Sequence, residues 1–241
     1  MHSLDITFDV RLDTPPGKDP DALSQTLQMY HKHLWSKKLP SGQPFELDDA
    51  FPNAYLYHRS GLGEFFLASD SVIPTFTREA RISHVLSQIP LDEREEFLRI
   101  SYTIGGMMVF TGNRVGRKMT INGARGFHPR IKDRFDLTIE CIRRYYCNEQ
   151  SPLTDTLDRY GEFFSLFGDF RGYVEFFLLQ DLVTTDYSVV RFFTPFENFT
   201  TSPLPESVQA YDAYRRLAID FIEARGQRMN QYCSALAHEA Q

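Results

Sequence analysis

Basic residues concentrate in one segment of an otherwise acidic chain. The 241 residues have a formal net charge of −6. Residues 111–134 (TGNRVGRKMTINGARGFHPRIKDR) contain one acid, Asp133, and the bases Arg114, Arg117, Lys118, Arg125, Arg130, Lys132 and Arg134. Seven bases and one acid make this segment +6 and leave −12 on the rest of the chain. A charge reversal of this size predicts a site for an anionic partner, since guanidinium groups bind phosphate and carboxylate through paired hydrogen bonds.

The other residue types in this segment suit a phosphate-bearing ligand, such as nucleic acid or a nucleotide. Glycines let backbone N–H groups approach an anion, and asparagines add neutral donors. The predicted ligand-binding residues are Asn113, Arg114, Arg117, Lys118, Asn122, Arg125, Arg130 and Arg134. The alternative is structural: Arg114 and Arg117 would lie at a solvated hairpin tip, and Arg125 and Arg134 would pair with buried acids. Neither GxxxxGK[ST] nor GxGxxG occurs, so a nucleotide-binding fold is not predicted.

A catalytic interpretation needs an acid and a base beside this segment. His128 is the group there that could transfer a proton near neutral pH. Glu175 lies among phenylalanines and leucines, where a charged group is rarely buried unless it is paired. His128, Glu175 and Arg125 therefore form a candidate hydrolase site, although Glu175 could instead clamp Arg125 or Arg134. A third interpretation has no catalysis, and the basic hairpin docks an acidic protein partner or a second copy of the chain.

The remaining polar residues predict neither a metal nor a cofactor. His31 and His33 are two apart, so on a helix their rings point in different directions. Cys141, Cys147 and Cys233 are odd in number and form no CxxC pair, which is typical of a reducing compartment. No apolar run approaches about 18 residues, and the start lacks the pattern of a signal peptide. A cytoplasmic protein without a membrane span is expected.

The first half of the chain, residues 1–125, is predicted to be rich in β-structure. Apolar and polar residues alternate over 6–12, which indicates a strand. The other elements expected in this half are a helix over 21–35, a hairpin from 54–58 and 64–70, a helix over 78–88, a helix from 91, a strand over 102–110 kinked at Gly105–Gly106, a second hairpin strand over 118–121, and a loop over 122–129.

The second half, residues 126–241, is predicted to be helical. The elements expected are helices over 129–146, 152–168 and 170–182, a late strand over 187–193, and a C-terminal helix over 206–236. We find no repeat and no linker polar enough to mark a boundary. The pattern favours one α+β domain over 1–241, with an antiparallel sheet mainly from the N-terminal half packed against a helical C-terminal half.

Several segments together resemble an uncharacterised bacterial domain family of unknown function. They are, in order, LWSKKLP, FFLASDS, TIGGMMVF, KMTINGARG, DRFDLTIECIRRYY, SPLTDTLDRYGEFFSLFGDFRGYVEFFLLQDLV and FFTPFENF. The resemblance extends from about residue 7 to residue 228. It implies a soluble bacterial protein that stands alone, and it supplies no activity, cofactor or catalytic residue.

Overall fold

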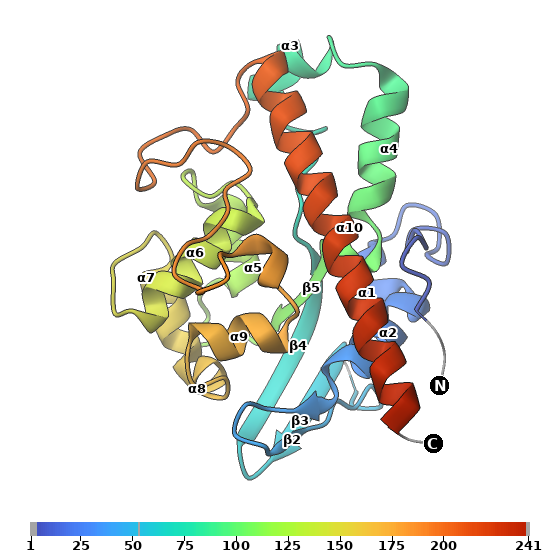
Figure 1. The fold of residues 1–241 in the computed structure, drawn as a ribbon, viewed down its shortest axis with the longest axis vertical. Coiled ribbons are helices and arrows are strands. Elements are labelled where there is room, and N and C mark those ends of the chain that lie inside the picture. Colours follow the sequence, from blue (N-terminus) through green and yellow to red (C-terminus); the bar gives the residue numbers. More distant parts are fainter. Residues whose placement is uncertain (1–3, 53, 240–241) are drawn as a thin grey trace.

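A three-stranded antiparallel sheet lies between two groups of helices (Figure 1). The computed structural model describes residues 4–52 and 54–239. The helices are α1 (Pro20–Leu23), α2 (Gln25–Trp35), α3 (Ser83–Leu86), α4 (Leu91–Ser101), α5 (Ile121–Phe127), α6 (Phe135–Tyr146), α7 (Thr154–Leu157), α8 (Gly161–Ser165), α9 (Phe170–Phe176) and α10 (Val208–Glu239). Single turns of 3-10 helix are η1 (Ala80–Ile82), η2 (Ile104–Gly106), η3 (Asp158–Tyr160) and η4 (Gln180–Leu182). The fold is α+β.

The sheet is built by β3 (Leu56–Ser60), β4 (Gly63–Ser71) and β5 (Met107–Thr111), in that order. Tyr57 lies opposite Phe66, which confirms the predicted hairpin. A smaller pair joins β1 (Lys37–Lys38) to β2 (Pro44–Phe45). All strands of the described residues lie in the first half, although that half also contributes α1 to α4. None of the helices in the described parts of the chain is long and apolar enough to cross a membrane.

The predicted strand over 6–12 is wrong, and its residues form turns. The carboxylate of Asp9 accepts the backbone N–H of Arg11 at 3.0 Å, and Asp5 does the same for Thr7. Such short side-chain bonds compete with strand pairing. The predicted helix over 21–35 is divided at Ser24, whose hydroxyl caps α2 by accepting the N–H of Leu27.

The centre of the basic segment is helical instead of forming a hairpin strand and loop. Thr120 caps α5, since its hydroxyl accepts the N–H of Gly123 at 3.3 Å. The helix predicted from 129 begins only at Phe135, because Lys132 and Asp133 have φ of 50° and 64°. Two successive left-handed residues cannot continue a right-handed helix.

The C-terminal half contains shorter elements than the pattern predicts. The helix expected over 152–168 is divided into α7, η3 and α8, and the helix expected over 170–182 ends at Phe176. The late strand reduces to a single bridge between Val183 and Val190. The long C-terminal helix is confirmed as α10, which crosses the molecule in Figure 1. Buried apolar side chains of both halves form one continuous cluster.

Gly105→Ala should destabilise the fold. A Cβ at Gly105 would lie 2.1 Å from the carbonyl oxygen of Ile222, so η2 and α10 would have to separate. Overpacking of this kind costs about 1–3 kcal/mol. Urea denaturation should show that loss for Gly105→Ala and little change for the control Gly61→Ala, where no atom lies within 4 Å of the added Cβ. Equal midpoints for the two variants would contradict the close packing of η2 on α10.

Candidate functional site

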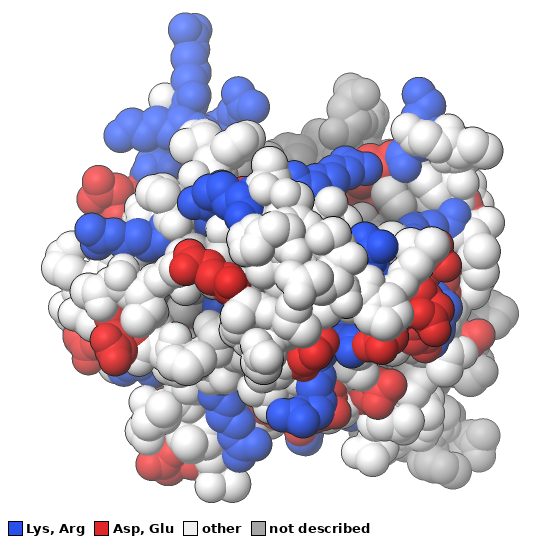
Figure 2. All heavy atoms as spheres, turned by 90° about the horizontal axis from the view of Figure 1, so that it is seen from above, with Lys and Arg blue, Asp and Glu red and all other residues white. Residues whose placement is uncertain are grey.

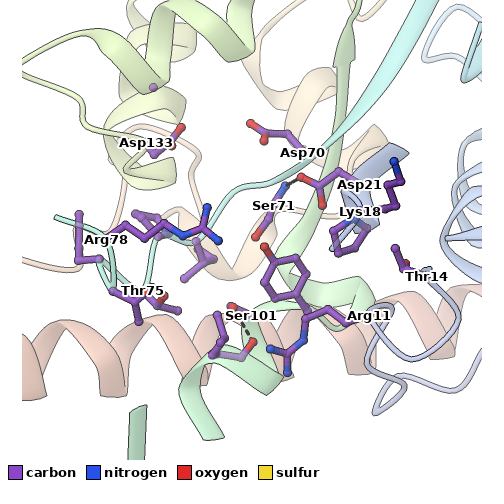
Figure 3. Close-up of a pocket in the computed structure, with 18 of the residues that line it drawn as sticks. Arg11, Thr14, Lys18, Asp21, Asp70, Ser71, Thr75, Arg78, Ser101 and Asp133 are labelled. Carbon is purple, nitrogen blue, oxygen red and sulfur yellow. Dashed lines mark hydrogen bonds between the residues drawn. The ribbon is translucent and has the colours of Figure 1, made fainter. Parts of the chain in front are cut away.

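A pocket of about 710 Å³ opens between the N-terminal loop and the end of the basic segment (Figure 3). Its walls come from the loop 11–20, the first turn of α1, the end of β4, the segment 73–79, the end of α4 and the turn 126–133. The lining residues come from four stretches that are far apart in sequence, 11–21, 70–79, 98–102 and 126–133. The polar side chains that line the pocket are therefore brought together only by the fold.

The guanidinium of Arg125 is fully buried behind this pocket and holds one wall together. Its Nε donates to Thr138 Oγ1 at 3.2 Å, and its Nη2 donates to the carbonyl oxygens of Val72 and Asp133. Its Nη1 contacts Asp70 Oδ2 at 2.5 Å and Asp133 Oδ1 at 2.9 Å. One buried cation thus positions two carboxylates that line the pocket.

The turn after α5 places Asp133 beside Arg125. The N–H of Asp133 donates to the carbonyl oxygen of Arg125 at 3.2 Å. Asp133 has φ of 64°, a conformation that costs a non-glycine residue about 1–3 kcal/mol. A Cβ at Gly126 would lie 3.2 Å from Asp133 Oδ1, so the glycine leaves room for the carboxylate. Asp133 therefore keeps a strained backbone conformation at the point where its carboxylate lines the pocket.

Asp21 adds a third carboxyl group to the wall, and both Asp21 and Asp70 have raised pKa values. Burial raises the pKa of Asp21 to about 6, against the hydrogen bond from the Ser71 N–H at 2.9 Å. Burial also raises the pKa of Asp70 to about 7; Arg125 opposes this rise, while Asp133 and Asp21 add to it. Both carboxyl groups therefore exchange protons close to neutral pH.

Four cationic side chains surround the mouth of the pocket, and two of them already have acidic partners. Arg11 pairs with Asp9, and Lys132 lies 3.4 Å from Glu79. Lys18 and Arg78 are exposed, and within residues 4–52 and 54–239 neither forms an ion pair. In Figure 3 Arg78 reaches into the cavity from the side opposite Asp21 and Asp70.

The exposed members of the predicted ligand-binding set lie outside this pocket. Asn113, Arg114, Arg117 and Lys118 are in the loop between β5 and α5, and Arg130 follows α5. The four basic side chains make no ion pair to any residue that the structure describes. Figure 2 shows that Lys and Arg are most prominent along one edge of the face seen from above, with Asp and Glu interspersed elsewhere. Surface charge is thus mixed, with local basic patches.

The structure corrects the prediction of direct ligand contact for Arg125 and Arg134. Arg125 exposes none of its surface, and Arg134 exposes 1%. Arg134 pairs with buried Asp136 and donates to Thr194 Oγ1 at 2.6 Å and to the carbonyl oxygen of Pro203 at 3.1 Å. Both guanidinium groups are saturated inside the protein, as the structural alternative expected. Asn122 is partly buried in α5, and its Oδ1 has no hydrogen-bond partner among the described residues.

The candidate catalytic residues are not linked to each other by any hydrogen bond or ion pair of the described residues. His128 ends α5, where its Nδ1 accepts the N–H of Arg130; burial and the Arg130 charge lower its pKa. Glu175 is exposed and pairs with Arg171 at 2.8 Å. The suggested clamp from Glu175 to Arg125 or Arg134 is wrong, because Arg171 lies one helical turn away on α9 and meets Glu175 first.

Sequence reasoning missed Asp21, Asp70 and Arg78. Asp21 and Asp70 are 49 positions apart, and neither belongs to a recognisable motif. The available signal was the polar run Ser69–Asp70–Ser71 directly after an apolar strand, and the proline-rich loop before Asp21. Within residues 4–52 and 54–239, no group of three or more His, Cys, Asp or Glu side chains is arranged to hold a metal ion.

Asp70→Asn should change how stability depends on pH. The folded protein holds the Asp70 proton to about pH 7, whereas the ordinary pKa of an aspartic acid side chain is 3.8. Wild-type stability therefore falls as pH rises between these values, by at most about 1.4 kcal/mol per pH unit from this group. The free energy of unfolding of Asp70→Asn relative to wild type should rise from pH 5 to pH 7. The exposed control Asp220→Asn should give a flat difference, and a flat difference for Asp70→Asn would contradict the raised pKa.

Comparison with known proteins identifies the family but no activity. No curated protein and no solved structure matches the chain significantly. The model of a family of unknown function, DUF6994, matches residues 4–229, which includes every element that lines the pocket. The chain belongs to this family of unknown function.

Proposed function

We propose that the protein binds a small ligand that carries a phosphate or carboxylate group in the pocket between the N-terminal loop and the turn 126–133. The observation that carries this proposal is Arg78, an exposed guanidinium without an acidic partner among the described residues, which points into a pocket of about 710 Å³. Pockets of about 300–1,000 Å³ are typical for small molecules. The proposal keeps the expected anionic ligand and moves its contacts away from most of the basic segment.

The chemistry of the mouth supports an anion. A guanidinium fork matches two oxygens of a phosphate or carboxylate, and the ammonium group of Lys18 adds a second positive charge. Thr75 and Thr77 add hydroxyl groups from the same segment as Arg78. Lys132, from the end of the basic segment, supplies a further cation, which Glu79 partly neutralises at 3.4 Å. The phosphate could belong to a nucleotide or to a sugar phosphate, since both present the same oxygens.

Arg78→Ala should weaken binding of a phosphate ligand about tenfold or more, because hydrogen bonds to charged groups contribute about 1.5–3 kcal/mol. Isothermal titration with inorganic phosphate, ribose 5-phosphate and adenosine monophosphate would measure this. The matched control is Arg216→Ala, an exposed arginine of α10 outside the pocket. Absence of binding to all three probes by the wild-type protein, or an equal loss in both variants, would overturn the proposal.

A second candidate function is docking of a larger anionic partner on the exposed basic loop. The specific observation is that Arg114, Arg117, Lys118 and Arg130 are exposed and unpaired among the described residues. The partner could be nucleic acid, an acidic protein or a second copy of the chain.

Arg117→Ala combined with Lys118→Ala separates these partners. If the loop binds single-stranded RNA or DNA, affinity should fall as salt rises, and the double variant should reduce the salt dependence by about two charges. If it binds protein, nucleic acid should be ignored and the variant should abolish a complex seen by light scattering. Unchanged behaviour in both measurements would remove the loop as a binding surface.

A further inference from the structure

The inner wall of the pocket has more carboxyl groups than its buried cation can pair with. Asp21, Asp70 and Asp133 all line the cavity. The fully buried guanidinium of Arg125 contacts two of them, Asp70 and Asp133, through the same Nη1. Three carboxyl groups thus share one buried positive charge.

Asp21 has unused hydrogen-bonding capacity at this wall. Its Oδ2 accepts the N–H of Ser71 at 2.9 Å, whereas its Oδ1 is buried and has no partner among the described residues. A buried carboxylate oxygen without a donor is unfavourable by about 1–3 kcal/mol or more. In Figure 3 the carboxylate of Asp21 faces the cavity beside Ser71.

The opposite side of the same cavity has the opposite charge. Arg78 enters there, facing Asp21 and Asp70 across the pocket (Figure 3). Arg78 and Asp21 do not form an ion pair with each other. Arg78 thus forms a positive pole, and Asp21 and Asp70 form a negative pole, on opposite sides of the cavity.

We infer that the pocket takes a zwitterionic ligand, whose phosphate meets Arg78 while an ammonium or similar N–H donor group meets Asp21 and Asp70. This inference rests on the proposed function and adds the second half of the ligand. A ligand with a phosphate alone brings a negative charge toward three carboxyl groups that line the pocket. A ligand with an amino group at its other end satisfies both poles.

Three related probes separate the two poles: phosphoethanolamine has both charged groups, ethyl phosphate has only the anion, and ethanolamine has only the cation. Isothermal titration should show phosphoethanolamine binding about tenfold or more tightly than ethyl phosphate, the size expected for one charge-assisted contact. Asp21→Asn should remove this advantage and leave ethyl phosphate binding as strong as before or stronger. The control Asp220→Asn, an exposed acid of α10, should change neither affinity.

The outcomes distinguish the inference from the proposed function. Equal binding of phosphoethanolamine and ethyl phosphate to the wild-type protein overturns the zwitterion and leaves the phosphate site in place. Binding of ethanolamine without binding of either phosphate overturns the phosphate site. Arg78→Ala provides a second readout that does not depend on Asp21: it should weaken both phosphate probes and leave ethanolamine unaffected. Binding of none of the three probes overturns both.

Discussion

The buried guanidinium of Arg125 is the contact on which the pocket depends. It joins α5 to the end of β4 through Asp70, to the following segment through Val72, and to α6 through Thr138. A buried charge is tolerated only when it is paired and its donors are used. Here each nitrogen of the guanidinium has a protein acceptor, so the sheet, the basic segment and the helical half meet at one point with a defined geometry.

Another buried arginine, Arg225, satisfies backbone carbonyl groups elsewhere in the fold. Arg225, in α10, exposes none of its surface and donates to the carbonyl oxygens of Gly105, Met107 and Phe177. Burial lowers its pKa to about 9, and the charge of Asp181 only partly opposes this. Short helices and 3-10 turns leave many carbonyl oxygens without an intrahelical donor. A long cationic side chain with five N–H groups satisfies several of them at once, so α10 is anchored to η2, β5 and α9 by hydrogen bonds as well as by apolar packing.

The chemistry of the candidate site depends on charged side chains that the protein does not fully pair with opposite charges. Where Arg134 meets Asp136, one acid faces one base and both are buried, so this pair is structural. At the pocket, Arg125 faces two acids with a third nearby, and the unpaired base Arg78 lies across the cavity. The surplus of each sign remains accessible to a ligand. The ratio of acids to bases, more than the number of charged groups, distinguishes the pocket from the ion pairs of the core.

The sequence by itself determined the elements whose signals are local. The hairpin of β3 and β4, helix α4 after Pro90 and the long helix α10 follow from alternation, a helix-start proline and a continuous apolar stripe. The concentration of bases over 111–134 is also a property of the sequence. Local patterns failed where side chains bond to nearby backbone, as Asp9 does, and where left-handed residues such as Lys132 and Asp133 interrupt a helical pattern.

Only the tertiary structure decided which charged residues are structural and which face a cavity. Arg114 and Arg125 are the same residue type in one basic segment, yet the first is solvated and the second is fully buried. Asp21, Asp70 and Asp133 meet because α1, β4 and the turn after α5 pack together, and no spacing in the chain encodes that meeting. Burial and the balance of neighbouring charges set what an ionisable group can do, and both are properties of the folded surroundings.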